Sequence, residues 1–136
     1  MSEPVTYDDF QQYQTRKKTI ENTEDLIEQT YYAVYSPRID YTGTTVSISK
    51  KDPTTRALEK IEMLRERNAA LIHRNQLVED AINSMEDPFL QQLCNYRYLL
   101  GYSWRETTAR VYGRLDGAPN AAREFCRRHL KALGID

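Results

Sequence analysis

The chain is poor in the residues that most often carry catalytic or metal chemistry. Its 136 residues include two histidines, two cysteines, one tryptophan and five glycines. The glycines form neither a GxGxxG motif nor a P-loop, and no HExxH sequence is present. Two pairs of acidic residues have structural explanations: Glu79-Asp80 belongs to a solvated helix face, and Glu86-Asp87 to a helix cap. We therefore predict no catalytic residue, no metal site and no cofactor, and the chain is not expected to be an enzyme.

Long apolar runs are also missing. No stretch approaches the roughly 18 consecutive apolar residues that a membrane-spanning helix requires. Residues 1–4 lack the basic start and the apolar core of a secretory signal peptide. Cys94 and Cys126 fall at apolar positions without a CxxC spacing, which favours reduced core thiols over a disulfide. These absences predict a cytoplasmic protein that makes no membrane contact.

Charge is unevenly distributed along the chain, although the formal net charge is only −1. Residues 1–86 contain 11 Lys or Arg and 15 Asp or Glu, whereas residues 87–136 contain 8 Lys or Arg and 5 Asp or Glu. The C-terminal part is therefore basic, which is compatible with local contacts to phosphate groups.

The N-terminal part has a helical pattern followed by a loop. Apolar positions recur at alternating steps of three and four residues from Phe10 to Val34, with Lys17 and Glu24 as interruptions, which predicts one long helix. The helix is expected to end near Ser36-Pro37, because proline disfavours the helical conformation of the residue before it. Residues 37–52 are rich in Gly, Ser, Thr and charge and predict a long surface loop, which is expected to be either mobile or a binding element.

A second long helix is expected from Asp52, as its cap, and Pro53, in its first turn. Mostly apolar residues recur along this helix at steps of three and four and form a stripe on one side, with two asparagines among them. The stripe has two possible interpretations. Asparagines at a-type positions of a parallel coiled coil fix the register and favour a dimer, so the stripe could be a seam between two chains. Alternatively, the stripe packs on the first helix as an antiparallel hairpin, or two such hairpins form a bundle. The candidate oligomerisation residues are Ile61, Leu64, Asn68, Leu71, Asn75, Val78 and Ile82.

Three shorter helices are predicted in residues 87–136. Asp87 is expected to cap the first, which has a broad apolar face and ends at Gly101. Ser103 and Glu106 have the spacing of a capping box, so a second helix should run from Trp104 to about Tyr112, with the indole wedged between the three helices. Turn residues separate it from a third, arginine-rich helix. Helix, turn and basic helix in this order is typical of proteins that read the major groove of DNA.

Several segments resemble a known family. They are Ser-Pro-Arg-Ile-Asp-Tyr-Thr-Gly (residues 36–43), the long charged helix, Glu86-Asp87-Pro88, Arg-Tyr-Leu-Leu-Gly-Tyr-Ser-Trp (residues 97–104) and Ala121-Ala122-Arg123. In this order, over residues 30–133, they look like the small phage and prophage transcriptional regulators of the ArpU and RinA type. The C-terminal half is similar to region 4 of sigma factors. The resemblance implies a helix-turn-helix protein that activates phage late or packaging genes in Gram-positive hosts.

The chain departs from the family pattern at two places. Thr107-Thr108 stand where the family usually has an aliphatic residue and alanine, and the turn from Val111 to Pro119 is longer than in a tight helix-turn-helix. Neither departure affects the fold assignment. The orientation of the third, arginine-rich helix, which would be the recognition helix, depends on the length of the turn.

The last helix provides the candidate DNA contacts. Its expected inner face contains Ala122, Phe125, Cys126, His129, Leu130 and Leu133. Arginine can read guanine, asparagine can read adenine and glutamate can accept from cytosine, and residues near the helix start usually reach the bases. The candidates for base contacts are Asn120, Arg123, Glu124 and Arg127. Those for phosphate contacts are Arg105, Arg110, Arg114, Arg128 and Lys131.

The sequence therefore predicts an all-α protein. Residues 1–86 should form a helical hairpin or coiled coil for oligomerisation, and residues 87–136 a three-helix helix-turn-helix domain. The expected function is sequence-specific transcriptional regulation, with double-stranded DNA, a second copy of the chain and host RNA polymerase as partners. The alternatives are a protein like the small subunit of phage terminase, which would form a ring, and a coiled-coil assembly protein whose basic end contacts an acidic partner.

Overall fold

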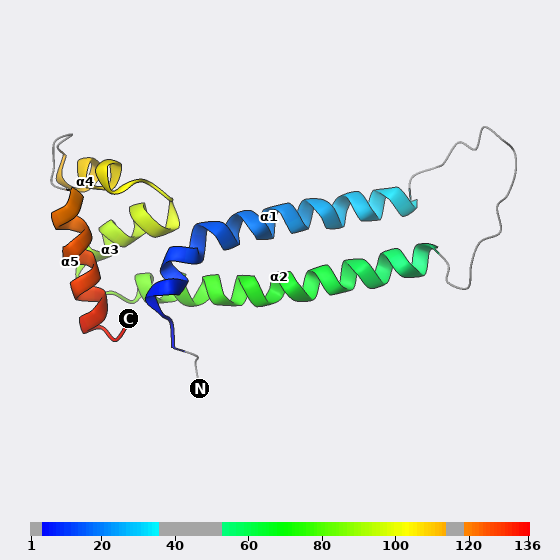
Figure 1. Ribbon diagram of the computed structural model, residues 1–136, viewed down its shortest axis with the longest axis horizontal. Helices are drawn as coiled ribbons and strands as arrows, with labels where there is room; N and C mark the ends of the chain where they lie inside the picture. The colour runs from blue at the N-terminus through cyan, green and yellow to red at the C-terminus, as the bar shows by residue number, and fades with distance from the viewer. Residues whose placement is uncertain (1–3, 36–52, 114–118) are drawn as a thin grey trace, which may run out of the picture. The chain divides into compact units, whose positions relative to one another are not determined.

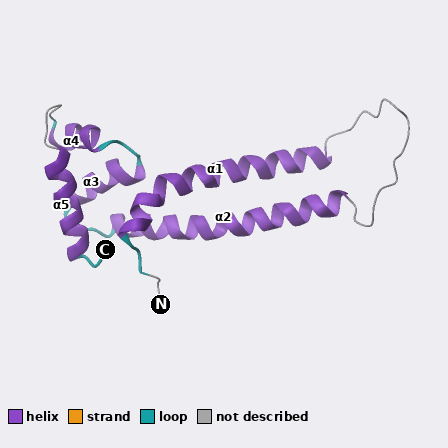
Figure 2. Cartoon of the chain, viewed as in Figure 1, coloured by secondary structure: helices purple, strands orange, loops and turns teal. Residues whose placement is uncertain are grey.

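The computed structural model describes residues 4–35, 53–113 and 119–136, and all regular structure in these ranges is helical (Figure 2). The elements are α1 (Tyr7–Tyr35), α2 (Pro53–Asn83), α3 (Pro88–Cys94), a π-helical turn η1 (Asn95–Leu99), α4 (Trp104–Tyr112) and α5 (Pro119–Ala132). Figure 1 labels the five α-helices. The prediction of an all-α fold is confirmed. The predicted loop 37–52 and the middle of the turn before α5 lie outside the described residues.

The chain divides into two compact units. Unit 1 comprises residues 1–18 and 72–136, and unit 2 comprises residues 19–71, so that α1 and α2 each contribute to both. The predicted boundary at residue 86 does not coincide with this division. The first turns of α1 and the last turns of α2 belong to the same unit as α3, α4 and α5.

Unit 2 consists of parts of α1 and α2. Ile61 and Leu64 of α2 are buried, and the buried side chain of Asn68 donates from Nδ2 to the Ile20 carbonyl of α1 at 3.2 Å. The asparagine therefore contacts the backbone of its own chain, whereas its buried Oδ1 has no hydrogen-bond partner among the described residues.

In unit 1, α1 begins with a capping box made by Thr6 and Asp9. The Asp9 backbone N–H donates to Thr6 Oγ1 at 3.2 Å, and the Thr6 backbone N–H donates to Asp9 Oδ2 at 2.9 Å. The Asp9 residue is only 2% exposed, and its carboxylate also pairs with Arg16 at 3.0 Å and with Arg74 of α2. The charged groups thus fix the start of α1 to α2.

The same unit contains the main core. Its buried residues come from α1, α2, α3, η1, α5 and the C-terminus, and they are Phe10, Tyr13, Val78, Ile82, Leu90, Cys94, Tyr98, Cys126, Leu130 and Ile135. Asn75, also buried, donates from Nδ2 to the Tyr13 carbonyl at 3.2 Å. α1 is therefore as much a part of this core as the C-terminal helices are.

The predicted oligomerisation residues of α2 are mostly buried in the single chain. Ile61, Leu64, Asn68, Asn75, Val78 and Ile82 are buried, and Leu71 is half-buried. Both asparagines donate to carbonyls of α1. A seam through these residues would require α1 to be displaced.

The helix predicted from Asp87 to Gly101 has an irregular second half. Its first half begins as predicted, because Asp87 Oδ1 accepts from the N–H groups of Phe89 and Leu90. After Cys94 the chain widens into η1, and the Leu100 N–H donates to the Asn95 carbonyl, five residues back, at 3.0 Å.

A side chain of α1 stabilises the end of this irregular segment. Gln14 donates from Nε2 to the carbonyls of Tyr98 and Leu99, at 2.9 and 2.7 Å. Gly101 follows with φ of +77°, and a Cβ atom there would lie 3.0 Å from Gln14 Cδ. The positive φ favours glycine at this position, and a Cβ atom would also require the Gln14 side chain to shift slightly.

Candidate nucleic-acid interface

α3, α4 and α5 pack on one another and on η1 within unit 1. Leu93 of α3 and Cys126 of α5 have no exposed surface. Thr107 and Thr108 are also buried, at 0% and 1% exposed, so the two threonines that depart from the family pattern occupy core positions of α4. Thr108 Oγ1 donates to the Trp104 carbonyl, which satisfies its hydroxyl inside the helix. The Thr107 hydroxyl is buried as well, but it has no hydrogen-bond partner in the described part of the chain, so only one of the two threonines has its hydroxyl satisfied there.

The start of α4 is capped as predicted. Ser103 is extended, with φ −63° and ψ 162°, and its Oγ accepts from the Glu106 N–H at 3.2 Å. At the other end, Gly113 has φ of +71° and ends the helix in the left-handed conformation.

Replacing Ser103 by Ala is expected to lower the free energy of unfolding by about 1 kcal/mol, because the Glu106 N–H loses its acceptor. Urea denaturation monitored by circular dichroism measures this. Ser103→Asp, which restores an acceptor at the cap, serves as the control and should return most of the loss. Equal stability of the Ala variant and the parent would show that the cap contributes nothing.

Trp104 is less enclosed than the sequence suggested. The indole is half-buried at the edge of the core and meets the Tyr98 ring edge-on, with ring centroids 6.2 Å apart. The Arg97 guanidinium lies 5.4 Å from the indole centroid. The indole therefore rests against η1, with part of its surface in solvent.

The inner face of α5 is correctly predicted except at its end. Ala122, Cys126 and Leu130 are buried, and Phe125 and His129 are half-buried. The prediction for Leu133 was wrong, because this side chain is 57% exposed.

The reason is a Schellman motif that reverses the chain at Gly134, which has φ of +84°. The Ile135 N–H donates to the Leu130 carbonyl at 2.9 Å, and the Gly134 N–H donates to the Lys131 carbonyl at 3.0 Å. The reversal brings Ile135, 7% exposed, into the core beside Leu130. Ile135 thus takes the place that helical periodicity assigned to Leu133.

Cys94 and Cys126 are free thiols, as predicted. Both are fully buried and their sulfur atoms are 3.6 Å apart, between α3 and α5. The contact with Cys126, together with burial, raises the pKa of the Cys94 thiol far above its usual range. The pair therefore acts as part of the core.

The outward side chains of α5 define the candidate interface. Its polar members are all exposed and are called here the α5 outer face: Asn120, Arg123, Glu124, Arg127, Arg128 and Lys131. The four candidates for base contacts, Asn120, Arg123, Glu124 and Arg127, line one shallow pocket of about 250 Å³. The structure therefore brings these four residues together on the side of α5 opposite its buried residues.

The candidate phosphate contacts on α4 are exposed too. Arg105 projects into solvent, and the Arg110 guanidinium lies over the Tyr102 ring, 4.6 Å from its centroid. Tyr102 in turn stacks on Tyr96 of η1, with centroids 5.9 Å apart. Arg114 lies outside the described residues.

Sequence reasoning missed one residue next to the α5 outer face. Tyr7, the first residue of α1, lies under Arg127, whose guanidinium carbon is 4.6 Å from the tyrosine ring centroid. No periodicity or motif could have indicated this contact, because the two residues come from opposite ends of the sequence.

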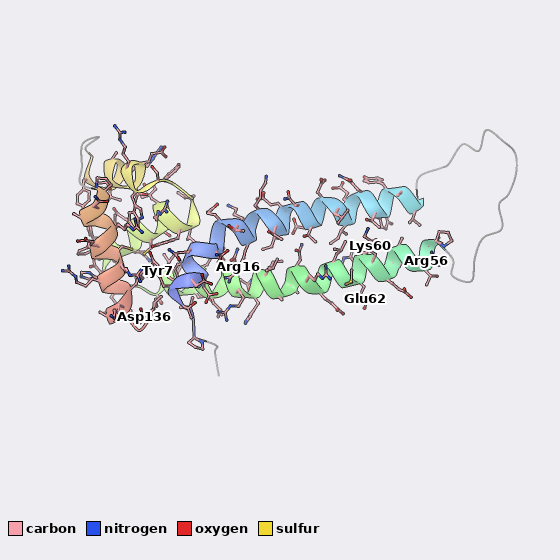
Figure 3. The ribbon with its side chains drawn as sticks, in the orientation of Figure 1. Tyr7, Arg16, Arg56, Lys60, Glu62 and Asp136 are labelled. Carbon is pink, nitrogen blue, oxygen red and sulfur yellow. The ribbon has the colours of Figure 1, made fainter. Side chains whose placement is uncertain are left out.

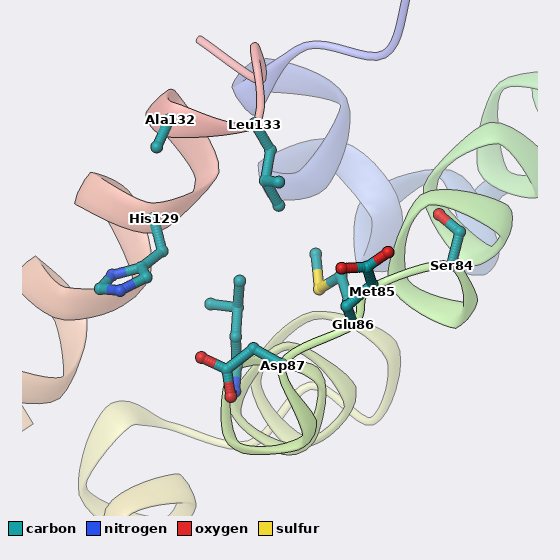
Figure 4. A pocket seen from close by; sticks show the side chains of 8 residues that line it. Ser84, Met85, Glu86, Asp87, His129, Ala132 and Leu133 are labelled. Carbon is teal, nitrogen blue, oxygen red and sulfur yellow. The ribbon is translucent and has the colours of Figure 1, made fainter.

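A second, larger pocket of about 460 Å³ lies between the end of α2, the start of α3 and the end of α5 (Figure 4). Leu90, Met85 and Leu133 supply apolar lining, and Glu86, Asp87 and His129 supply polar groups. None of the site residues predicted from the sequence lines this pocket.

Within residues 4–35, 53–113 and 119–136, no group of three or more His, Cys, Asp or Glu side chains could hold a metal ion. No helix in the same ranges is long and apolar enough to cross a membrane. No protein-family model, curated protein or solved structure matches the chain.

Proposed function

We propose that the protein binds double-stranded DNA sequence-specifically through the α5 outer face and acts as a transcriptional regulator. The observation that carries this proposal is the exposure of all six polar residues of that face, opposite the buried Ala122, Cys126 and Leu130. The face has four cationic side chains and one anionic side chain. Such a face on a helix packed against two others suits the negative potential and the base edges of a major groove.

The resemblance to ArpU- and RinA-type regulators supports a narrower version of this proposal. In it the protein activates phage late or packaging genes in the cytoplasm of the host, with RNA polymerase as a further partner. A homodimer would place two α5 helices on two half-sites about one helical turn of DNA apart. Because the α2 stripe is buried within one chain, such a dimer would use other surfaces.

The proposal predicts duplex binding that weakens steeply with salt. Each phosphate neutralised contributes about −0.9 to the slope of log K against log salt concentration. Arg128→Ala should make this slope less negative by about 0.9, the contribution of one phosphate, and should weaken binding to all sequences alike. Arg127→Ala should instead reduce discrimination at one base pair, by about 1–3 kcal/mol. Fluorescence anisotropy with a duplex selected from random sequence, and with its scrambled version, measures both effects.

The matched control is Lys60→Ala, which removes an exposed cation from α2 in unit 2 (Figure 3). This variant should bind with the slope and discrimination of the parent. If Arg127→Ala and Arg128→Ala also bind both duplexes as the parent does, the α5 outer face does not contact DNA.

A further inference from the structure

The start of α1 contributes an aromatic ring to the edge of the α5 outer face. The Arg127 guanidinium lies over the Tyr7 ring at 4.6 Å from the centroid, a distance at which a cation is attracted to the face of the ring. Both residues belong to unit 1. The contact therefore joins the N-terminal helix to the helix that we propose reads DNA.

The tyrosine ring is itself held in place. Tyr7 is half-buried and packs against the main core, which contains Tyr98. Tyr7 also lies beside Asp136 (Figure 3), and the Tyr7 backbone N–H donates to the Asp136 carbonyl at 3.5 Å. The preceding residue, Thr6, is fixed by the capping box with Asp9. The ring is thus a fixed support rather than a mobile surface group.

The contact with Tyr7 leaves N–H donors of Arg127 available. The guanidinium carbon lies over the ring, and a guanidinium has five N–H donors, more than one ring can cover. Arg127 remains exposed and lines the shallow pocket with Asn120, Arg123 and Glu124. A guanidinium held in this way can still donate two parallel hydrogen bonds to one guanine.

We propose that Tyr7 is a positioning residue that orders Arg127 for base recognition. This inference rests on the proposed DNA-binding function. An arginine that is already restrained in the free protein loses less side-chain entropy when it binds, so Tyr7 should strengthen the contact that Arg127 makes and no other. The reading surface then includes a residue of α1, and an intact N-terminal helix is needed for full specificity.

The experiment compares Tyr7→Leu, Tyr7→Phe, Arg127→Ala and the double variant Tyr7→Leu/Arg127→Ala in the full chain. The probe is a duplex selected from random sequence, together with versions that carry single base-pair changes. Tyr7→Leu keeps an apolar side chain but removes the ring face, and we expect it to lower discrimination at the Arg127 position about two- to five-fold. Tyr7→Phe keeps the ring and should discriminate as the parent does. In the Arg127→Ala background, Tyr7→Leu should have no further effect.

A measurement without DNA checks the contact itself. In the NMR spectrum of the free protein, the Arg127 side-chain protons should show a ring-current shift that persists in Tyr7→Phe and disappears in Tyr7→Leu. Unchanged discrimination in Tyr7→Leu would overturn the inference while leaving DNA binding in place. An equal loss of discrimination in the Arg127→Ala background would also overturn it, because Tyr7 would then act through the fold. A parent chain that binds no duplex would overturn the proposed function and this inference together.

Discussion

Replacing Phe10 by Ala is expected to lower the free energy of unfolding of unit 1 by about 3–5 kcal/mol, which is the usual cost of removing a buried phenyl ring. Phe10 belongs to α1 but is only 1% exposed, and it meets the Tyr98 ring edge-on with centroids 5.2 Å apart. Small domains are stable by only about 5–15 kcal/mol in total, so this change removes a large part of that stability. Urea denaturation monitored by circular dichroism measures the loss.

The control for this variant is Leu26→Ala, in the part of α1 that belongs to unit 2, where the side chain is 40% exposed. It should cost far less, because much of the leucine already contacts water. DNA binding by Phe10→Ala should fail at the urea concentration at which unit 1 unfolds. If Phe10→Ala unfolded at the same midpoint as the parent, α1 would not be part of the core that supports α5.

Local signals in the sequence predicted the starts of α3 and α4. Asp87 and Ser103 are short polar residues placed directly before helical patterns, and both accept hydrogen bonds from the N–H groups of the helices that follow. The predicted end of the first long helix at Ser36-Pro37 lies outside the described residues. Caps and prolines act within a few residues, so a sequence pattern can identify them without knowledge of the tertiary fold.

Features that depend on distant residues were not predictable in this way. The widened turn η1 ends where Gln14 reaches its carbonyls from α1, more than eighty residues earlier in the chain. The apolar stripe of α2 could not by itself distinguish a partner helix in the same chain from one in another, because both bury the same side. The asparagines of α2 donate to the carbonyls of Ile20 and Tyr13. Which carbonyls accept these hydrogen bonds depends on how α1 packs, and the sequence pattern of α2 does not contain this information.

In the candidate interface, too, local features were predictable from the sequence and contacts with distant residues were not. The spacing of the arginines in α5 predicted which of its residues are exposed, because helical periodicity separates the two faces. It predicted neither the exposure of Leu133 nor the contact between Arg127 and Tyr7. The first depends on a glycine that reverses the chain after the helix, and the second on the docking of a helix from the other end of the sequence.

The second large effect is expected at Asp9. Asp9→Asn should lower the free energy of unfolding at pH 7 by about 3 kcal/mol, because it leaves Arg16 and Arg74 without their shared counter-charge in a largely buried site. The variant keeps the size of the side chain, so the loss reports the charge rather than a cavity. Urea denaturation measures it. Asp8→Asn, at the exposed neighbouring position in the first turn of α1, is the matched control and should change stability by no more than about 0.5 kcal/mol.

The effect of Asp9 should depend on pH in a defined direction. Burial alone would raise the pKa of this carboxyl group. Hydrogen bonds from the Thr6 backbone, Arg74 and the Thr6 hydroxyl, together with the ion pair with Arg16, outweigh burial and hold the pKa below its ordinary value of 3.8. A carboxyl group with a lowered pKa in the folded state contributes its full stabilisation above the pKa of the unfolded chain. This contribution is lost as the pH falls below 3.8 and through the folded-state pKa, because the folded protein must then take up the proton.

The difference in stability between the parent and Asp9→Asn should therefore be constant from pH 7 down to about pH 5 and should shrink steadily below pH 4. Denaturation series at several pH values for the parent, Asp9→Asn and Asp8→Asn would follow this difference. If it stayed constant down to pH 2, the negative charge of Asp9 would not be what attaches the start of α1 to α2.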